Sequence, residues 1–380
     1  MVSKTNFDTK IAMTLLKGNR RMFGMALDPA DDPRSLELKR AWMLRAGKAA
    51  GDRGETCLDP YDAITSRLRE ILDGRNIQPS GKFPVPSWLW PKPEPADFPL
   101  VTPQNIGDFY DSGGLLATLK RLQSFVEKEI FPARPVMVGI DHSATAGVIS
   151  ALAARYGSEN LSVIVLDQHF DALPLSVRIA GAGETVMSRL DGMPLALSNI
   201  TSRYQDHCCC GNFWAYLMDE GRILPENISF IGVADYPGRP VRPAGDRLFQ
   251  KSYLSFEDRG CRFFPLERFD VPYLDALKKF VGERIRTPYA YVSLDLDVGS
   301  YNCTWAARYM DRPGISAQNL LDIAAEIRQA CQQNNTELAG FDIMEFNMHF
   351  LGIETDDGIK DATLSTVGEF INMLTVETIL

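Results

Sequence analysis

The chain alternates short apolar runs with longer segments in which apolar residues recur every three or four positions. The short runs are rich in β-branched and aromatic residues, which is typical of strands buried on both faces. Strands are predicted at residues 136–140, 161–166, 228–233, 289–294 and 338–343. Helices are predicted at residues 114–130, 145–156, 273–285 and 316–332, the last capped by Ser316. This alternation predicts a three-layer α/β/α sandwich with a central, mainly parallel sheet.

Two irregular segments interrupt the alternation. Residues 83–103 contain many prolines and show no period, which predicts an extended surface excursion rather than a hinge between domains. Residues 172–209 are long and rich in Gly, Pro and Ser, so we expect a loop beside an active site. A first strand is predicted at residues 22–27, after an N-terminal extension that covers about residues 1–21. We therefore interpret residues 1–380 as a single domain.

Six residues with metal-ligand chemistry stand where predicted strands end. They are His142, Asp167, His169, Asp171, Asp295 and Asp297. Ligands bind at the carboxyl ends of strands in open parallel sheets, and residues two apart share one face of a continuing strand. One such aspartate would more often cap a turn or a helix, but the six together hold two of the four histidines of the chain. Two imidazoles and four carboxylates suit a pair of divalent ions that share a hydroxide, whereas a single ion needs only three or four ligands.

The composition narrows the possible partners. The net charge is −9 and no Lys/Arg-rich run occurs, so we expect neither nucleic acid nor an anionic membrane as a partner. No apolar stretch is long enough for a secretory signal or a membrane span, so we expect a cytoplasmic enzyme, with an organellar leader as the alternative. Seven cysteines at irregular spacing favour a reducing compartment.

Four motifs, GIDHS, LDQHFDA, VSLDLD and GFDIMEFN, together resemble the signatures of the arginase and agmatinase superfamily of ureohydrolases, in the same order. The resemblance implies an arginase-like fold in which the six residues bind two manganese ions, or nickel as in some guanidine-cleaving relatives. It further implies that Glu345 binds the guanidinium group of the substrate. A hydroxide that bridges the ions would attack this group, and Asp171 would pass a proton to the leaving amine. The implied products are urea and an amine or ammonia, and family analogy suggests a homo-oligomer, either a trimer or a hexamer.

The sequence departs from the family pattern after the second motif. Family members usually have a histidine before glycine in an HGxxF-like stretch, where this chain has Cys210 in CGNF. His207 or Cys210 could replace that histidine as the proton shuttle, but each is equally consistent with a structural role as a loop histidine or a packed thiol. After Asp297 the letters VGSY replace an aspartate and a proline, which we expect to alter the loop rather than metal binding.

The sequence alone leaves the substrate and the class of reaction open. The Asn/Thr/Ser-rich segment with which arginases bind an amino acid head group is absent, so we expect a small guanidino compound other than arginine. Free guanidine, a substituted guanidine and a guanidino acid all remain candidates. Two other classes are compatible with the fold: a metal-dependent amide deacetylase with a single zinc, and a non-catalytic or altered-chemistry paralogue.

Overall fold

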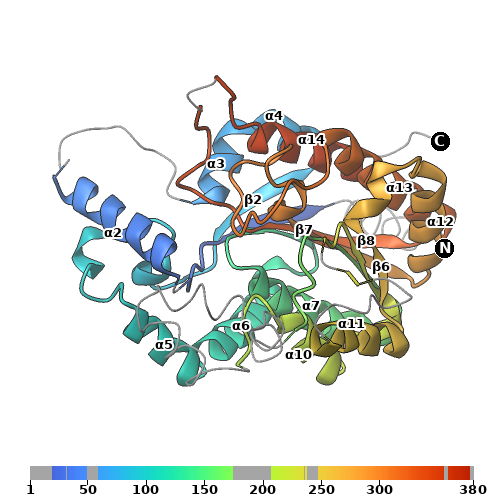
Figure 1. Ribbon diagram of the computed structural model, residues 1–380, viewed down its shortest axis with the longest axis horizontal. Helices are drawn as coiled ribbons and strands as arrows, with labels where there is room; N and C mark the ends of the chain where they lie inside the picture. The colour runs from blue at the N-terminus through green and yellow to red at the C-terminus, as the bar shows by residue number, and fades with distance from the viewer. Residues whose placement is uncertain are drawn as a thin grey trace, which may run out of the picture.

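One sheet of eight parallel strands forms the centre of the molecule (Figure 1). The computed structural model describes residues 19–30, 32–48, 59–173, 207–234, 236–237, 247–354 and 358–376. The strand order is β2-β1-β3-β8-β7-β4-β5-β6, and each neighbouring pair is parallel. The strands are β1 Arg20–Met25, β2 Ile77–Lys82, β3 Arg134–Gly139, β4 Leu161–Leu166, β5 Ile228–Ile231, β6 Arg262–Phe264, β7 Tyr289–Asp295 and β8 Glu337–Met344.

The sheet separates two apolar cores because successive side chains of a strand point to opposite faces. On β4, Leu161, Val163 and Val165 belong to one core, while Ile164 and Leu166 belong to the other. All six residues of this strand are buried. A strand covered on both faces has no solvent-facing positions, which explains why these segments are continuously apolar instead of alternating.

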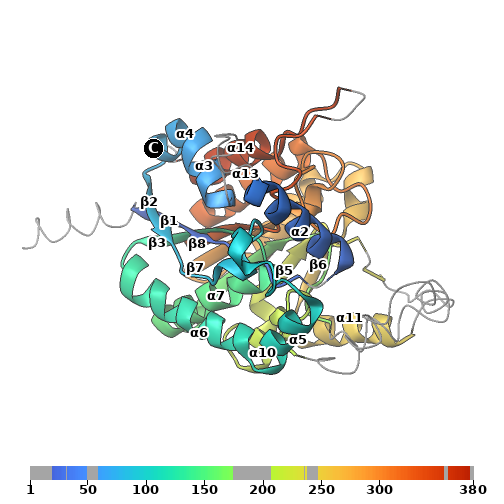
Figure 2. The same cartoon turned by 90° about the vertical axis from the view of Figure 1, so that its left-hand side faces the viewer.

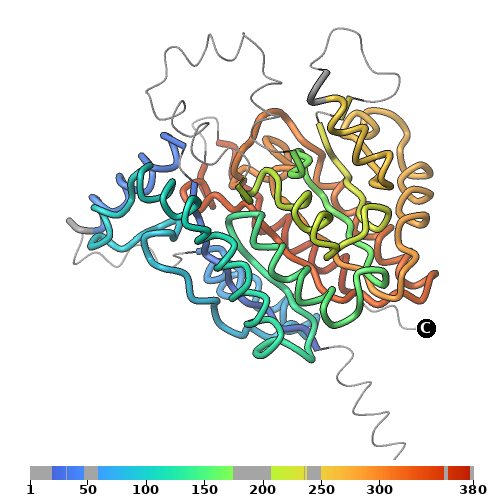
Figure 3. Tube along the Cα trace, turned by 90° about the horizontal axis from the view of Figure 1, so that it is seen from below, coloured from blue at the N-terminus to red at the C-terminus, as the bar shows by residue number. Residues whose placement is uncertain are grey.

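Helices cover both faces of the sheet (Figures 1 and 2). In Figure 3 the helices of one layer lie in front of the sheet, from teal α6 through green α7 to yellow α10 and α11. This layer comprises α5 Pro103–Asp111, α6 Gly114–Phe125, α7 Thr145–Tyr156, α10 Phe213–Asp219 and α11 Arg247–Arg259, and α2 Pro33–Lys48 packs on the same core. The opposite layer comprises α3 Pro60–Arg67, α4 Arg69–Gly74, α12 Leu274–Arg284, α13 Ala317–Gln333 and α14 Thr363–Thr375. The predicted α/β/α sandwich is confirmed.

The elements predicted from periodicity are all present, with ends shifted by a few residues. Ser316 caps α13 as expected, since its Oγ accepts a hydrogen bond from the backbone N–H of Asn319 within a capping box. The two edge strands β2 and β6 were not predicted. The first contains Pro79 and Gly81 and is mostly solvent-facing, and the second has only three residues, so neither carries an apolar pattern.

The proline-rich segment is irregular, as predicted, but it is not peripheral. Phe83, Val85, Leu89 and Val101 are buried in one of the two cores, so the segment covers apolar surface near α6. The predicted N-terminal extension lies largely outside the described residues, as does most of the predicted loop, residues 174–206. Among the described helices, none combines the length and the apolar character that crossing a bilayer requires.

Gly314 fixes the backbone that follows the last two predicted ligands. A Cβ added there would lie 2.0 Å from the carbonyl oxygen of Val298, next to Asp297. We expect Gly314→Ala to displace this turn and to lower the free energy of unfolding by about 1–3 kcal/mol. Gly282→Ala is the matched control, because no atom lies within 4 Å of the added Cβ and the residue is helical. That variant should gain up to about 1 kcal/mol. Chemical denaturation of both variants checks the difference, and equal effects would contradict it.

Candidate metal centre

The six predicted ligands meet at the carboxyl edge of the sheet, and three of its strands carry them there. His142 follows β3, residues 167–171 follow β4, and Asp295 is the last residue of β7. The sheet order places β3, β7 and β4 within four adjacent positions, with β8 between β3 and β7. Segments far apart in the sequence therefore end beside one another.

The backbone at these ligands does not continue as a strand, although the sequence predicted that it would. β4 ends at Leu166, and Asp297 lies in the 3-10 turn Leu296–Gly299, so the ligand spacing of two does not reflect one face of a strand. Instead, each first aspartate turns the chain. Asp167 Oδ1 accepts a hydrogen bond from the backbone N–H of His169 (2.6 Å), and Asp295 Oδ1 accepts one from Asp297 (2.9 Å). These turns leave the second oxygen of each carboxylate to face the cluster.

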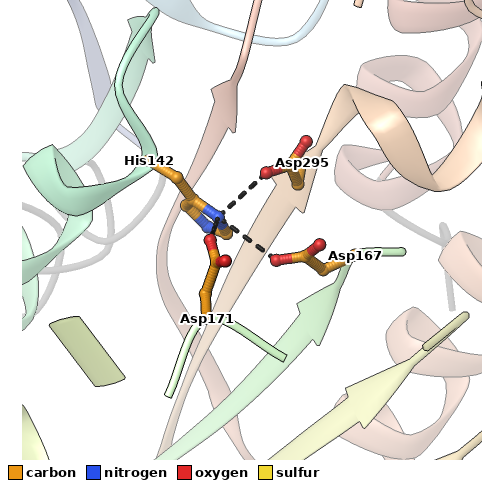
Figure 4. Close-up of side chains that lie close together, drawn as sticks. All are labelled: His142, Asp167, Asp171 and Asp295. Atoms are coloured by element: carbon orange, nitrogen blue, oxygen red, sulfur yellow. Dashed lines mark hydrogen bonds and ion pairs between the residues drawn. The ribbon is translucent and has the colours of Figure 1, made fainter. Parts of the chain in front are cut away.

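The first group of ligand atoms surrounds the imidazole of His142 (Figure 4). Its Nδ1 lies 3.0 Å from Asp295 Oδ2, 3.2 Å from Asp171 Oδ2 and 3.3 Å from Asp167 Oδ2. All four residues are buried, and their ligand atoms lie within 4.8 Å of one another. One nitrogen and three carboxylates at this separation have the composition and size of a divalent cation site.

A second group adjoins the first. It consists of Asp167, His169 and Asp297, whose ligand atoms also lie within 4.8 Å of one another. His169 Nδ1 lies 2.7 Å from Asp297 Oδ2 and 3.9 Å from Asp167 Oδ1. Since Asp167 belongs to both groups, the arrangement is that of a binuclear site with a shared carboxylate.

Hydrogen bonds on the far side of each imidazole determine which nitrogen faces the cluster. Ser293 Oγ donates to Asp342 Oδ1 (2.7 Å), so it can only accept from His142 Nε2 (2.9 Å). His142 therefore keeps a proton on Nε2, and Nδ1 is the nitrogen that faces the cluster and can bind an ion once it is deprotonated. Asp311 Oδ2 lies 2.9 Å from His169 Nε2 and imposes the same tautomer there.

Asp342 anchors this arrangement from within β8. Its Oδ2 also accepts hydrogen bonds from Thr145 Oγ1 (2.6 Å) and Tyr291 Oη (2.7 Å). Sequence reasoning did not identify Asp342, Ser293 or Asp311 as members of the site. An acid inside an otherwise apolar buried strand is the signal that could have identified Asp342, because such a group requires hydrogen-bond partners.

The buried carboxylates of the cluster repel one another, so their negative charge needs a balancing positive charge. Burial raises the pKa of Asp167 well above its usual range, and the neighbouring charges of Asp295 and Asp171 raise it further. Burial and the charge of Asp297 raise the pKa of Asp295 to about 7. Asp167 Oδ2 is buried without a hydrogen bond. Divalent cations would relieve this repulsion and bind that oxygen, so the residues present fit a pair of metal ions.

Two site residues adopt left-handed backbone conformations that are uncommon outside glycine. Asp171 has φ 48° and Glu345 has φ 62°. Such conformations cost on the order of 1–3 kcal/mol and persist where the surroundings impose them. The N–H of Trp214 holds the Asp171 carbonyl (3.2 Å), and the N–H of Arg308 holds the Glu345 carbonyl (2.9 Å). The side chains of both acids are therefore directed by a fixed backbone.

Glu345, the predicted substrate ligand, is buried beside the cluster, with 2% of its surface exposed. Its Oε1 accepts a hydrogen bond from the backbone N–H of His142 (3.0 Å). Its Oε2 lies 3.6 Å from Nε of Arg308, a residue that sequence reasoning did not identify. The structure thus places Glu345 where it was expected but with a guanidinium group of the same chain as its neighbour, and its predicted contact with substrate stays a prediction.

The two predicted proton shuttles occupy different positions. The side chain of His207 is 45% exposed, and its Nδ1 lies 3.8 Å from Asp111 Oδ1 on α5. Burial raises the pKa of Cys210 well above its usual range, and nearby charges that include those of Asp141, Glu345 and Asp171 add to the shift. Cys210 therefore borders the cluster as a neutral thiol, which is a poor base.

The altered loop after Asp297 is well supported by hydrogen bonds. Ser300 Oγ donates to the Asp297 carbonyl (2.6 Å), and Thr304 Oγ1 donates to the Leu296 carbonyl (2.6 Å). These bonds, with the close approach of Gly314, hold the turn without the aspartate and proline of the family pattern.

Known proteins resemble this chain in sequence pattern and in fold. A sequence model of the arginase family matches residues 90–355. The fold is similar to that of proclavaminate amidino hydrolase from Streptomyces clavuligerus, with a TM-score of 0.54 and 16% identity over 94% of this chain and 92% of that chain. It is also similar to arginase from Bacillus caldovelox, with a TM-score of 0.54 and 14% identity over 96% of this chain and 100% of that chain. Identities this low show a shared fold alone.

A third similar structure is Trypanosoma cruzi formiminoglutamase with Mn²⁺, which has a TM-score of 0.50 and 12% identity over 95% of both chains. Among curated protein sequences, none matches the chain significantly.

We expect Ser293→Ala to weaken metal binding, because the variant removes the group that fixes the His142 tautomer. Loss of such a partner typically lowers metal affinity about 10- to 100-fold, which a calorimetric Mn²⁺ titration would measure. Ser162→Ala is the control. Ser162 is also buried, but its Oγ bonds to the Arg284 carbonyl and to Thr287, away from the cluster. An equal loss of affinity in both variants would show that the tautomer argument is wrong.

Proposed function

Because the chain belongs to the arginase family, we propose that it is a binuclear-metal hydrolase that cleaves a C–N bond of a guanidino or amidino compound and releases urea and an amine or ammonia. The observation that carries the proposal is the pair of adjacent donor groups with Asp167 in common. Two such groups are what distinguish a two-ion hydrolase from a site that needs a single cation.

The residues that would hold the ions follow from the two groups. His142, Asp167, Asp171 and Asp295 would bind one ion, and Asp167, His169 and Asp297 the other. We propose manganese, with nickel as the alternative, because imidazole and carboxylate donors suit both. When bound, the ions would lower the pKa of a water and neutralise charge that develops on the substrate.

The residues of the chain supply the remaining functions. Ser293 and Asp311 contact Nε2 of the two imidazoles, so Nδ1 of each ring is the nitrogen that would bind an ion once its proton has left. Asp171 is the ligand through which we propose that a proton passes, because its carboxylate retains 10% exposure while those of Asp167 and Asp295 are almost fully enclosed. The proton would reach the leaving amine from Asp171 Oδ1 or Oδ2.

The number of bound metal ions distinguishes the proposed hydrolase from an amide deacetylase. A single-zinc deacetylase would need only the first donor group, and the second group of Asp167, His169 and Asp297 would then have no function. The second group also has its own supporting contact, from Asp311 to His169. A supporting contact of its own for the second donor group favours a site that binds two ions.

A urea-release screen tests the proposed reaction. The substrates are guanidine, methylguanidine, agmatine, guanidinobutyrate, guanidinoacetate and arginine, each assayed separately with manganese-loaded and nickel-loaded protein. Urea from at least one of them supports the proposal. Urea from none would favour a non-hydrolytic paralogue that keeps the fold.

Asp167→Ala tests the shared ligand. We expect the variant to lose both ions and all turnover, because Asp167 contributes to each donor group and its loss leaves both incomplete. Elemental analysis of metal-loaded, desalted protein measures the first effect, and urea release the second. Asp219→Ala removes an exposed carboxylate on α10 and should change neither. If Asp167→Ala retains activity with an unchanged metal content, the ligand assignment is wrong.

A further inference from the structure

A cavity lies at the amino edge of the sheet, opposite the metal centre. It has a volume of about 500 Å³, and its walls are the first residues of β1, β3, β7 and β8 together with the C-terminal ends of α13 and α14. β8 runs from this cavity towards Glu345, and its eight residues separate the two ends by roughly 23 Å at about 3.3 Å per residue. A ligand bound in the cavity would therefore lie far from the metal centre.

The charged side chains that line the cavity are mostly positive. Among the described residues they are Arg20, Arg134 and Arg328, with Glu337 as the one carboxylate, which gives a net charge of +2. The whole chain has a net charge of −9, so the cavity is opposite in sign to the molecule. Positive charges held together and partly withdrawn from water repel one another, and a bound anion relieves that repulsion.

Glu337 is already committed to one of these arginines. Its Oε1 accepts a hydrogen bond from Arg134 Nε (3.0 Å) and lies 3.0 Å from Arg134 Nη2. The pair connects the first residues of β3 and β8, which are neighbouring strands. Glu337 thus neutralises one arginine and leaves the net positive charge of the cavity to the other two.

Arg328 has the greatest capacity to bind a ligand. It is half-buried on α13, and its Nε is enclosed without a hydrogen-bond partner. Among the described residues that line the cavity, the only carboxylate is that of Glu337, which pairs with Arg134 instead. A buried donor without a partner is unfavourable, so an acceptor that reaches Nε gains more there than it would at the surface.

A purely structural role for arginines at this edge would be to bind the carbonyls at the ends of helices. Arg20 does so, since its Nη1 donates to the carbonyl of Arg75 beyond α4 (3.3 Å). At the end of α13, the carbonyls of residues 330–332 instead accept hydrogen bonds from the backbone N–H groups of residues 334–336. These carbonyls are satisfied without Arg328, so capping of its own helix does not account for this residue.

We propose that this cavity binds an oxyanion, either a phosphate or a carboxylate group, and that Arg328 is its principal contact. A guanidinium binds either group through two parallel hydrogen bonds, and the charge of Arg20 adds to the attraction. Ile327, Leu338 and Leu374 line the same cavity and can contact an apolar part of the ligand beside the charged group. Because the site lies at the opposite edge of the sheet, it does not depend on the reaction proposed for the metal centre.

Calorimetric titration with two probes tests the site. The full chain is titrated with inorganic phosphate and with butyrate, and sodium chloride at equal ionic strength is the control for screening. We expect at least one probe to bind at one ion per chain, and Arg328→Met to weaken that binding about tenfold through the loss of charge-assisted hydrogen bonds. Arg328→Lys keeps the charge without the planar fork and should bind with intermediate affinity. Tighter binding of phosphate identifies a phosphate ligand, and tighter binding of butyrate a carboxylate ligand.

Arg284→Met is the matched control. Arg284 is the last residue of α12 in the same helical layer, it is half-buried, and its Nε is also enclosed without a hydrogen bond, but it does not line the cavity. This variant should bind the probe as the wild type does. The proposal is overturned if neither probe binds, if chloride has the same effect, or if Arg284→Met loses as much affinity. Unchanged affinity in Arg328→Met would also overturn it, because the ion would then bind elsewhere, for example at the metal centre.

Thermal unfolding gives a second readout. The probe that binds should raise the unfolding temperature of the wild type and of Arg284→Met, because a ligand that binds only the folded state stabilises it. At the same probe concentration the rise should be small or absent in Arg328→Met. Destabilisation alone would lower the unfolding temperature of this variant but would not remove its response to the probe. An equal rise in all three proteins would contradict the assignment of Arg328.

Discussion

Repulsion between buried carboxylates is the constraint on which the functional edge of the molecule depends. Asp167, Asp171 and Asp295 approach one imidazole nitrogen within 3.3 Å, and all are withdrawn from water. Two unit charges about 4 Å apart interact by about 4 kcal/mol at the effective dielectric constant of a partly hydrated site. Such a group is stable only with protons or cations among the carboxylates. The rest of the fold can thus be understood as the means by which this arrangement is kept in place.

The parallel sheet provides that support in two steps. The central strands are buried on both faces and form a rigid platform, and their adjacent carboxyl ends bring residues from distant segments together. Asp167 and Asp295 then each use one oxygen to turn the chain and the other to face the cluster. Each of these aspartates can therefore both cap a turn and bind a metal ion, because a carboxylate has two oxygens. Gly314 and Ser300 hold the turn that follows β7 through hydrogen bonds.

Much of this could be predicted from the sequence, for physical reasons. Doubly buried strands and amphipathic helices leave periodic apolar patterns, so the sandwich, its six inner strands and four of its helices could be identified from pattern alone, although not their exact ends. Edge strands such as β2 lack that pattern, since one of their edges and much of their surface face water. His142 and the aspartates could be selected because strand-end acids in such number are costly unless they bind something. Their route through turns could not be derived, because spacing of two fits a strand and a turn equally well.

Arg308 could not be predicted as a neighbour of the site, because nothing in its local sequence marks it. Arg308 lies in a loop. Its position beside the site becomes evident only in the folded chain, where Asp28 and Glu345, which follow two strands, form ion pairs with it. A motif specifies which atoms can ligate a metal, since coordination chemistry tolerates few alternatives. Recognition of the rest of the substrate depends on charges that several geometries can supply. In this chain the carboxylate of Glu345 has an arginine of the same chain as its neighbour, which the motif around Glu345 does not indicate. A catalytic centre can accordingly be read from sequence with more certainty than the molecule on which it acts.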